Sequence, residues 1–376
     1  MKKHLIILLV ALSLICVTGC KKKEPVVVPE PVEEVVEPEE EIVEVVEEVE
    51  EPEEIEEEEE KEEVREGFYR SEFTNEWTDE AIKDQRPIAV MIDNEKTALP
   101  HYGTSQADVV YEMMNSTLND RITRFMCIFK DYNSISQIGS IRSVRTTNLQ
   151  ISPEYNAIVV HDGGPLYINA YFKNPYVDHL SGGFSRIKNG KPTEFTEYIT
   201  EGQITKRCEE AGISLTYNEY FQGNHWLFSS DKHPTDLSLM DKSIPCTKIE
   251  LPYKHNGSKL EYIEETGVYR YSEYGEEYKD ALTDDYLEFK NLIIQECDFE
   301  QYDEHGYMNF FVHEGVDKTG YFITNGYAVP IVWAKDKFDM YPTYFCYEDL
   351  NLIQLNTGKT YVCIVPSDSW SQLVVK

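Results

Sequence analysis

Two arginines three residues apart, Arg142 and Arg145, are the residues of this sequence whose type and spacing best suit the recognition of an anion. They follow Gly139 and Ser140 and should stand at a helix start, where both guanidinium groups can project on one side. Two guanidiniums beside free helix N–H groups form a receptor for a carboxylate or a phosphate. Internal pairing with Asp or Glu side chains is the alternative, and the spacing does not separate the two.

Arg124, Asp93 and Glu112 lie in or at the end of apolar runs. Arg124 interrupts such a run and must find a partner if it is buried. Asp93 and Glu112 each end one, so they could meet at one rim and act as general acid and base in glycoside cleavage. We prefer the interpretation in which either carboxylate forms a salt bridge with Arg124 or Arg142.

The motif His161-Asp162-Gly163-Gly164 directly follows another apolar run. A strand that leads into a tight glycine turn is a frequent place for a ligand site in α/β proteins. His161 could therefore act as a base and Asp162 could contact a ligand, although a lone histidine more often only caps a strand. Since no known metal, phosphate-loop or nucleophile motif stands in a suitable context, we predict neither a metal site nor a cofactor.

The elements that must position these residues can be read from the hydrophobic pattern of the first half. Short apolar runs bounded by turn residues or charges predict buried strands. Helical patterns interleave with them, and Gly212 closes the last helix. The alternation predicts a mixed α/β domain at 67–235, with strands at 87–92, 108–113, 122–129 and 157–160 and helices at 143–151, 165–172 and 204–211.

The second half, from Cys246 onward, has a different pattern of short strands separated by turn signals. It predicts a β-rich domain at 240–376, a sandwich or barrel. The join falls near 230–245, where His233-Pro234 breaks the periodicity. The predicted fold class is therefore α+β, and the second-half strands are expected at 267–271, 288–295, 307–313, 319–323, 328–333, 352–355 and 360–365.

The first nineteen residues have the features of a secretory signal rather than of a membrane-spanning helix. Basic residues at the start precede an apolar run, from Leu5 to Val17, that is too short to span a bilayer comfortably. The run ends in Val17-Thr18-Gly19-Cys20, which resembles the bacterial lipobox. Cys20 is therefore the predicted lipidation site and mature N-terminus, and a lipid anchor would hold the protein at the outer face of the cytoplasmic membrane.

The segment 20–66 is predicted to be a disordered acidic linker. Between residues 30 and 66 it contains 22 Glu against one Lys and one Arg, so it carries −20 of the chain's net charge of −34. Such a composition cannot bury enough apolar surface to fold. The repulsion it creates argues against nucleic acid and anionic lipid as partners. The oligomeric state stays open.

The cysteines beyond Cys20 are widely scattered and include no C-x-x-C pair. This spacing offers no zinc motif. Cys127 and Cys363 lie inside apolar strand-like runs, as small buried hydrophobic residues do. We therefore expect mostly free thiols among Cys127, Cys208, Cys246, Cys297, Cys346 and Cys363.

Several motifs, taken in their order along the sequence, resemble the YerB-like lipoproteins of Gram-positive bacteria, a two-part family of unknown function. They are RPIAVMIDN at 86–94, SQADVVYE at 105–112, ITRF at 122–125, IGSIRSVR at 138–145, VHDGG at 160–164 and LNTGKTYV at 355–362. One element departs from the family pattern, because Thr193-Glu194-Phe195 stands where the family often has Pro-His-Asn. The resemblance implies two-domain organisation and an envelope location, and it implies no established chemistry.

Two functions of different classes follow from these observations. The first is a non-catalytic module that binds a cell-wall polymer such as peptidoglycan, or an envelope partner, with aromatic residues on sugar rings and arginines on anionic groups. The second is an envelope glycan hydrolase or lyase that uses Glu112 or Asp93 with His161. We prefer binding, because no complete nucleophile and base arrangement is visible. An enzyme would need its acid, base and anion-binding groups to converge in one cleft.

Overall fold

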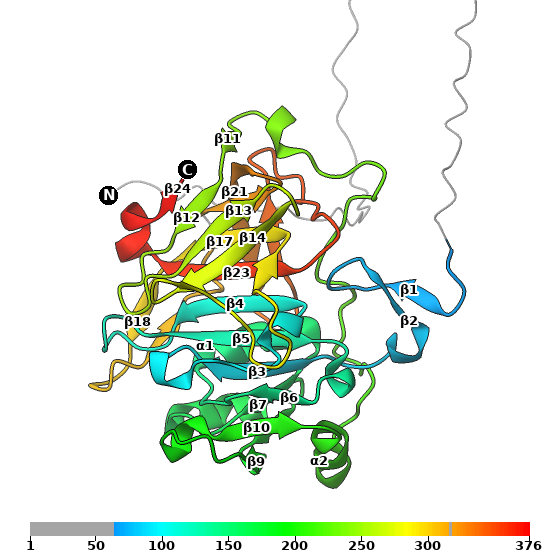
Figure 1. Ribbon diagram of the computed structural model, residues 1–376, viewed down its shortest axis with the longest axis vertical. Helices are drawn as coiled ribbons and strands as arrows, with labels where there is room; N and C mark the ends of the chain where they lie inside the picture. Colours follow the sequence, from blue (N-terminus) through cyan, green and yellow to red (C-terminus); the bar gives the residue numbers. More distant parts are fainter. Residues whose placement is uncertain (1–63, 316–317) are drawn as a thin grey trace, which may run out of the picture. The chain divides into compact units, whose positions relative to one another are not determined.

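An eleven-stranded sheet contains strands from both halves of the sequence (Figure 1). The computed structural model describes residues 64–315 and 318–376, which fall in the unit Glu62–Lys376. The strand order is β11-β21-β20-β17-β23-β4-β5-β3-β7-β8, with β22 beside β21. The signal peptide predicted at 1–19, the lipidated Cys20 and all but the last residues of the acidic linker lie outside the described residues.

The large sheet takes five strands from the first half of the chain and six from the second. The first five are β3 (Ile88–Asp93), β4 (Val109–Met114), β5 (Thr123–Phe129), β7 (Ile158–His161) and β8 (His179–Ser181). The other six are β11 (Ile244–Pro245), β17 (Asn291–Cys297), β20 (Thr319–Thr324), β21 (Tyr327–Lys335), β22 (Thr343–Cys346) and β23 (Thr360–Pro366).

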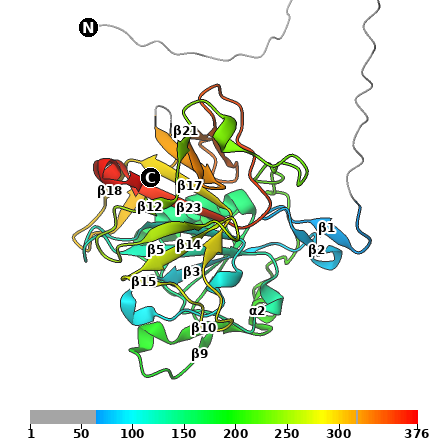
Figure 2. The ribbon, with the colours of Figure 1, turned by 45° about the horizontal axis from the view of Figure 1, so that its top comes forward.

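Four smaller sheets accompany it. A six-stranded sheet contains β12 (Lys248–Glu250), β13 (Lys259–Ile263), β14 (Val268–Glu273), β15 (Glu276–Glu277), β16 (Glu288–Phe289) and β24 (Val374–Val375). A three-stranded sheet contains β6 (Gln137–Gly139), β9 (Ser185–Arg186) and β10 (Glu197–Thr200). Two hairpins complete the set, and the first lies to one side of the sheets (Figure 2); they are β1 (Phe68–Arg70) with β2 (Trp77–Asp79) and β18 (Phe299–Gln301) with β19 (Met308–Phe310).

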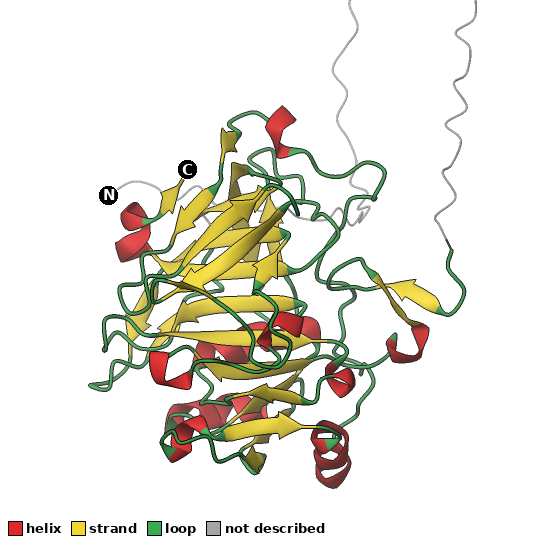
Figure 3. Cartoon of the chain, viewed as in Figure 1, coloured by secondary structure: helices red, strands yellow, loops and turns green. Residues whose placement is uncertain are grey.

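The described residues are mostly β, with few helices (Figure 3). The predicted helix at 204–211 is confirmed as α2 (Gln203–Ala211), whereas the one predicted at 143–151 is the shorter α1 (Thr146–Ile151). The segment predicted as a helix at 165–172 is a 3-10 helix, Leu166–Lys173. No helix of the described residues has the length and apolar character of a membrane span.

The central strands β3, β4 and β5 are almost wholly apolar because both faces of the sheet are covered, and their charged exceptions are Asp93, Glu112 and Arg124. All six residues of β3 and all seven of β5 are buried. A strand buried on both faces shows a continuous rather than an alternating hydrophobic pattern. β23 lies between β17 and β4 and is parallel to both, so the sheet continues from one half of the sequence into the other.

Candidate functional site

Three arginines meet at a cavity of about 290 Å³, which we call the arginine pocket. Arg124 comes from β5, and Arg142 and Arg145 come from the segment before α1. Asp93, at the end of β3, and Tyr307, just before β19, complete its centre. The full lining is Asp93, Glu95, Asn115, Ser116, Leu118, Asn119, Ile122, Arg124, Arg142, Arg145, His305 and Tyr307.

Strand register brings the charged groups together. β3 and β5 are antiparallel neighbours, and Asp93 is directly opposite Arg124. The Arg142 backbone N–H donates to the Met91 carbonyl at 2.8 Å, which holds Arg142 beside the end of β3. The prediction that Arg142 stands at a helix start is wrong, since it lies on the segment before the helix and Arg145 is the N-cap of α1.

Asp93 is the counter-ion of two of the arginines. Its carboxylate, 1% exposed, pairs with Arg142 Nε and lies 3.6 Å from an Arg124 nitrogen. Burial raises the pKa of Asp93, but the guanidiniums of Arg124 and Arg142 outweigh it and hold that pKa below its usual range. Asp93 is therefore ionised and unsuited to donate a proton, and the salt bridge expected for it is present.

Arg145 has a different environment, although it is only 7% exposed. Its guanidinium lies over the Tyr307 ring, 4.2 Å from the centroid, and donates to the Val144 carbonyl at 3.0 Å. No carboxylate of the described residues lies within ion-pair distance of Arg145, and its Nε has no hydrogen-bond partner. Burial lowers the pKa of Arg145. A buried cation without a counter-ion is costly unless an anion reaches it.

Arg142 also contacts the segment that departs from the family pattern. Its guanidinium pairs with the Glu194 carboxylate at 3.1 Å and lies over the Phe195 ring, 5.2 Å from the centroid. Arg142 is 22% exposed, so it is the arginine of this pocket with the most solvent contact. Neither the ion pair of Glu194 with Arg142 nor the position of Tyr307 in the pocket could be predicted from the sequence, because both residues come from distant segments.

Glu112 does not lie in the arginine pocket. It is fully buried on β4 and accepts hydrogen bonds from the Tyr361 hydroxyl at 2.5 Å, the Thr123 hydroxyl at 2.8 Å and the Tyr271 hydroxyl at 3.0 Å. The salt bridge to Arg124 or Arg142 that we expected for Glu112 is therefore wrong. Burial raises the pKa of Glu112 despite these donors.

His161 and Asp162 form a separate cluster. His161 is 2% exposed, contacts the His179 Nδ1 through Nε2 at 3.1 Å and stacks on Phe172. Burial lowers the pKa of His161 to about 4, so the ring is neutral at pH 7. Asp162 pairs with Arg186 at 2.7 Å. Neither side chain lines the arginine pocket, and His161 has the contacts of a packed, hydrogen-bonded residue.

The described residues contain no candidate metal centre and no disulfide bond. No group of three or more His, Cys, Asp or Glu side chains there could hold a metal ion. Cys127, Cys208, Cys246, Cys297, Cys346 and Cys363 are free thiols, as the scattered spacing predicted, and all except Cys346 are buried.

Comparison with known proteins places both halves of the chain. Residues 73–214 match the N-terminal domain of the protein family of unknown function DUF3048, and residues 249–362 match its C-terminal domain. A curated protein of Bacillus subtilis (strain 168) that bears a lipoprotein name, YerB, is 24% identical over 300 residues, 77% of this chain and 84% of YerB.

The fold agrees with this relationship. The crystal structure of the YerB protein from Bacillus subtilis superimposes with a TM-score of 0.69 at 21% identity, covering 82% of this chain and 99% of the solved one. Two domains of one family in the expected order, together with this similarity of fold, establish the relationship. The chain therefore belongs to the YerB-like family of DUF3048 proteins.

Proposed function

We propose that this protein is a lipid-anchored envelope protein whose arginine pocket binds an anionic group of a cell-wall polymer or of another envelope partner. The observation that carries the proposal is the buried Arg145 guanidinium, which has no counter-ion among the described residues. A carboxylate or phosphate in the pocket would supply that charge through charge-assisted hydrogen bonds. Tyr307 and His305, which also line the pocket, would contact a sugar ring.

Binding is better supported than a glycan hydrolase or lyase. In the described residues Glu112 and His161 lie outside the arginine pocket, and Asp93 is held ionised by two arginines. The acid, base and anion-binding groups that such an enzyme needs thus do not converge. The lipobox-like segment at Cys20, outside the described residues, and the lipoprotein name of YerB support an anchor on the outer face of the cytoplasmic membrane.

Replacing Arg145 with Gln should weaken binding to purified cell wall by roughly 10- to 100-fold, because charge-assisted hydrogen bonds contribute about 1.5–3 kcal/mol each. The measurement is co-sedimentation of the detergent-solubilised protein with cell wall, with inorganic phosphate as a competitor. Arg270→Gln is the matched control, since Arg270 is 20% exposed and already paired with Glu277 and Glu288. Equal binding by both variants and wild type, with unchanged melting, would contradict the assignment of the pocket.

Replacing Cys20 with Ala should leave the precursor unprocessed and without lipid. The reason is that the acyl chains attach to this thiol, and each buried methylene contributes about 0.8 kcal/mol to membrane affinity. Mass spectrometry of the N-terminal peptide and membrane fractionation provide the readout. Cys16→Ala, inside the apolar segment, is the control and should be lipidated normally. Lipid-dependent retention that survives in Cys20→Ala would show that the anchor lies elsewhere.

A further inference from the structure

A second surface surrounds β22 and the turn that follows it, and none of its residues lines the arginine pocket. Six large hydrophobic side chains there are 38–83% exposed, namely Leu227, Leu239, Ile244, Tyr344, Leu350 and Leu352. They lie in or next to the segments that line two cavities, and the two linings adjoin in the sequence at Asn351 and Leu352. We call this surface the hairpin face. Apolar patches of this kind on a water-soluble surface mark interaction sites.

The first cavity, the aromatic pocket, has a volume of about 120 Å³ and is lined by Trp226, Leu227, Tyr344, Phe345 and Leu352 among others. Cavities that enclose a whole small molecule measure about 300–1,000 Å³, so this one suits a single side chain. The Trp226 and Phe345 rings stack with centroids 6.0 Å apart. The indole N–H of Trp226 is buried without an acceptor in the described part of the chain. Trp226 therefore reports directly on occupancy of this pocket.

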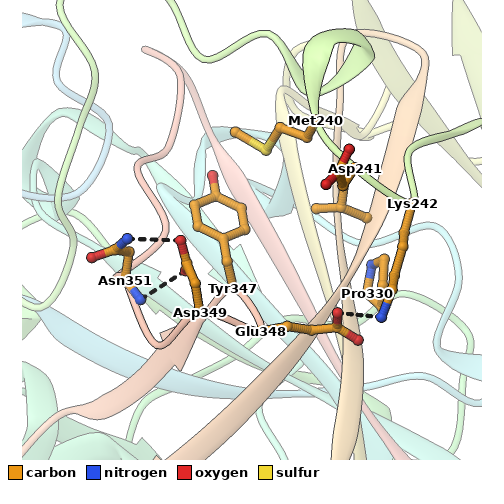
Figure 4. Close-up of a pocket in the computed structure, with 9 residues that line it drawn as sticks. Met240, Asp241, Lys242, Pro330, Tyr347, Glu348, Asp349 and Asn351 are labelled. Carbon is orange, nitrogen blue, oxygen red and sulfur yellow. Dashed lines mark hydrogen bonds and ion pairs between the residues drawn. The ribbon is translucent and has the colours of Figure 1, made fainter.

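The second cavity, the acidic pocket, measures about 520 Å³ (Figure 4). Its apolar lining comes from Met240, Val329, Pro330 and Tyr347, and the Tyr347 ring extends toward Met240. Its charged lining has three carboxylates and one ammonium group, and that ammonium, on Lys242, is paired with Glu348. The surplus of negative charge favours a cationic group in the partner. The three carboxylates belong to Asp241, Glu348 and Asp349.

The edge of β21 beside the acidic pocket limits how a partner can bind there. β11 pairs with β21 at Tyr327 and Ala328, whereas β22 pairs with it from Val332 to Lys335. Within the described part of the chain, residues 329–331 between them have no strand partner on this edge, and Pro330 has no N–H to offer one. Because the ladder cannot continue through Pro330, recognition here must come from side chains in the two pockets rather than from an added strand.

We infer that the hairpin face binds a protein segment that presents one apolar side chain to the aromatic pocket and a neighbouring Lys or Arg to the acidic pocket. Apolar anchors in small pockets dominate the energy of protein interfaces. A second copy of this chain is disfavoured as the occupant, because the chain remains acidic even without the −20 that its linker contributes to the net charge of −34. The partner is thus a basic protein segment.

The test is NMR spectroscopy of the full chain in detergent, labelled with 15N-tryptophan. The chain has four tryptophans and should give four indole signals. Trp226→Phe assigns the Trp226 signal. The probe is acetyl-Lys-Leu-Lys-amide at millimolar concentration, and acetyl-Glu-Leu-Glu-amide and acetyl-Lys-Ser-Lys-amide are the controls. We expect a saturable shift of the Trp226 signal with the first peptide alone. Leu352→Ser should weaken that binding by about tenfold or more, and Asp241→Asn should weaken it by less.

Several results would overturn the inference. A Trp226 signal that does not move with the basic peptide, or that moves equally with the acidic one, would show that the hairpin face lacks the proposed selectivity. Light scattering gives the mass of the particle in solution. A smaller mass for Leu352→Ser than for wild type would assign the hairpin face to self-association instead. Unchanged positions of the other three indole signals in Leu352→Ser establish that the variant is folded.

Discussion

Replacing Lys335 with Met should lower the free energy of unfolding by about 3–5 kcal/mol, since it leaves a buried carboxylate without its cation. The side chains of Lys335 and Glu154 are both 0% exposed, and their charged groups lie 2.9 Å apart. Burial raises the pKa of Glu154, but Lys335 and His225 outweigh it and lower that pKa to about 2. Glu154 is therefore ionised at neutral pH. The pair joins the first half of the chain to the end of β21.

Urea unfolding at neutral pH measures this effect. Lys206→Met is the matched control, because Lys206 is 74% exposed and 3.9 Å from Glu210, and it should change stability by less than about 1 kcal/mol. In the double variant Glu154→Gln, Lys335→Met, part of the lost stability should return, since neither charge is then left unpaired. A loss in Lys335→Met no larger than in Lys206→Met would mean that the buried pair does not stabilise the junction.

With Glu273 replaced by Gln, the protein should lose less stability than wild type as the pH rises. Glu273, on β14, is 3% exposed, and burial followed by the charge of Glu112 raises its pKa well above the usual value. Its Oε2 accepts from Asn256 at 3.3 Å, a contact that a Gln oxygen can keep, while Oε1 has no partner in the described residues. The folded protein thus holds a proton that the unfolded chain releases.

The direction in which stability changes with pH follows from this difference in proton binding. Stability from this group is fully present below the unfolded pKa, near 4.3, and is lost as pH rises toward the folded pKa, by about 1.4 kcal/mol per pH unit. Wild type and Glu273→Gln should therefore diverge between pH 5 and 7 in urea unfolding, with the variant more stable at pH 7. Asp108 and Glu197, whose pKa values burial raises to about 7, add the same slope to both proteins.

Glu276→Gln, which removes an exposed carboxyl group from the neighbouring strand β15, is the control and should leave the pH profile of wild type unchanged. Parallel stability curves for wild type and Glu273→Gln would show that Glu273 is ionised in the folded state.

The hydrophobic pattern predicted the strands buried on both faces, and it also predicted half-buried strands such as β14 and β20. The strand predicted at 352–355 is wrong, because that run forms only isolated bridges at Leu352 and Leu355. The runs at 87–92, 108–113 and 122–129 correspond to β3, β4 and β5 within one residue at each end. The pairing of β23 with β4 could not be predicted, because both strands are mainly apolar and nothing local selects the neighbour of either one. The short strands β12 and β22 were missed because so few residues show too little alternation to identify a strand.

The candidate site was predictable only where a residue violated its local pattern. Arg124 in an apolar strand had to find a partner, and it has Asp93. Glu112 offered a similar signal, but its position at a strand end does not reveal that tyrosines of the second half cover it. Arg145 was recognised from its spacing to Arg142, while its stacking on Tyr307 depends on a hairpin far along the chain.

The position of β23 has a consequence for how the chain matures. During synthesis the N-terminal part emerges first. β4 then lacks its neighbour β23, which lies far along the sequence. Such distant pairing gives a high contact order and slow folding. Until β23 arrives, β4 and β17 both have open edges that other nascent chains can pair with. The central sheet cannot close until β23 has formed, so a chain truncated before β23 would be prone to aggregate.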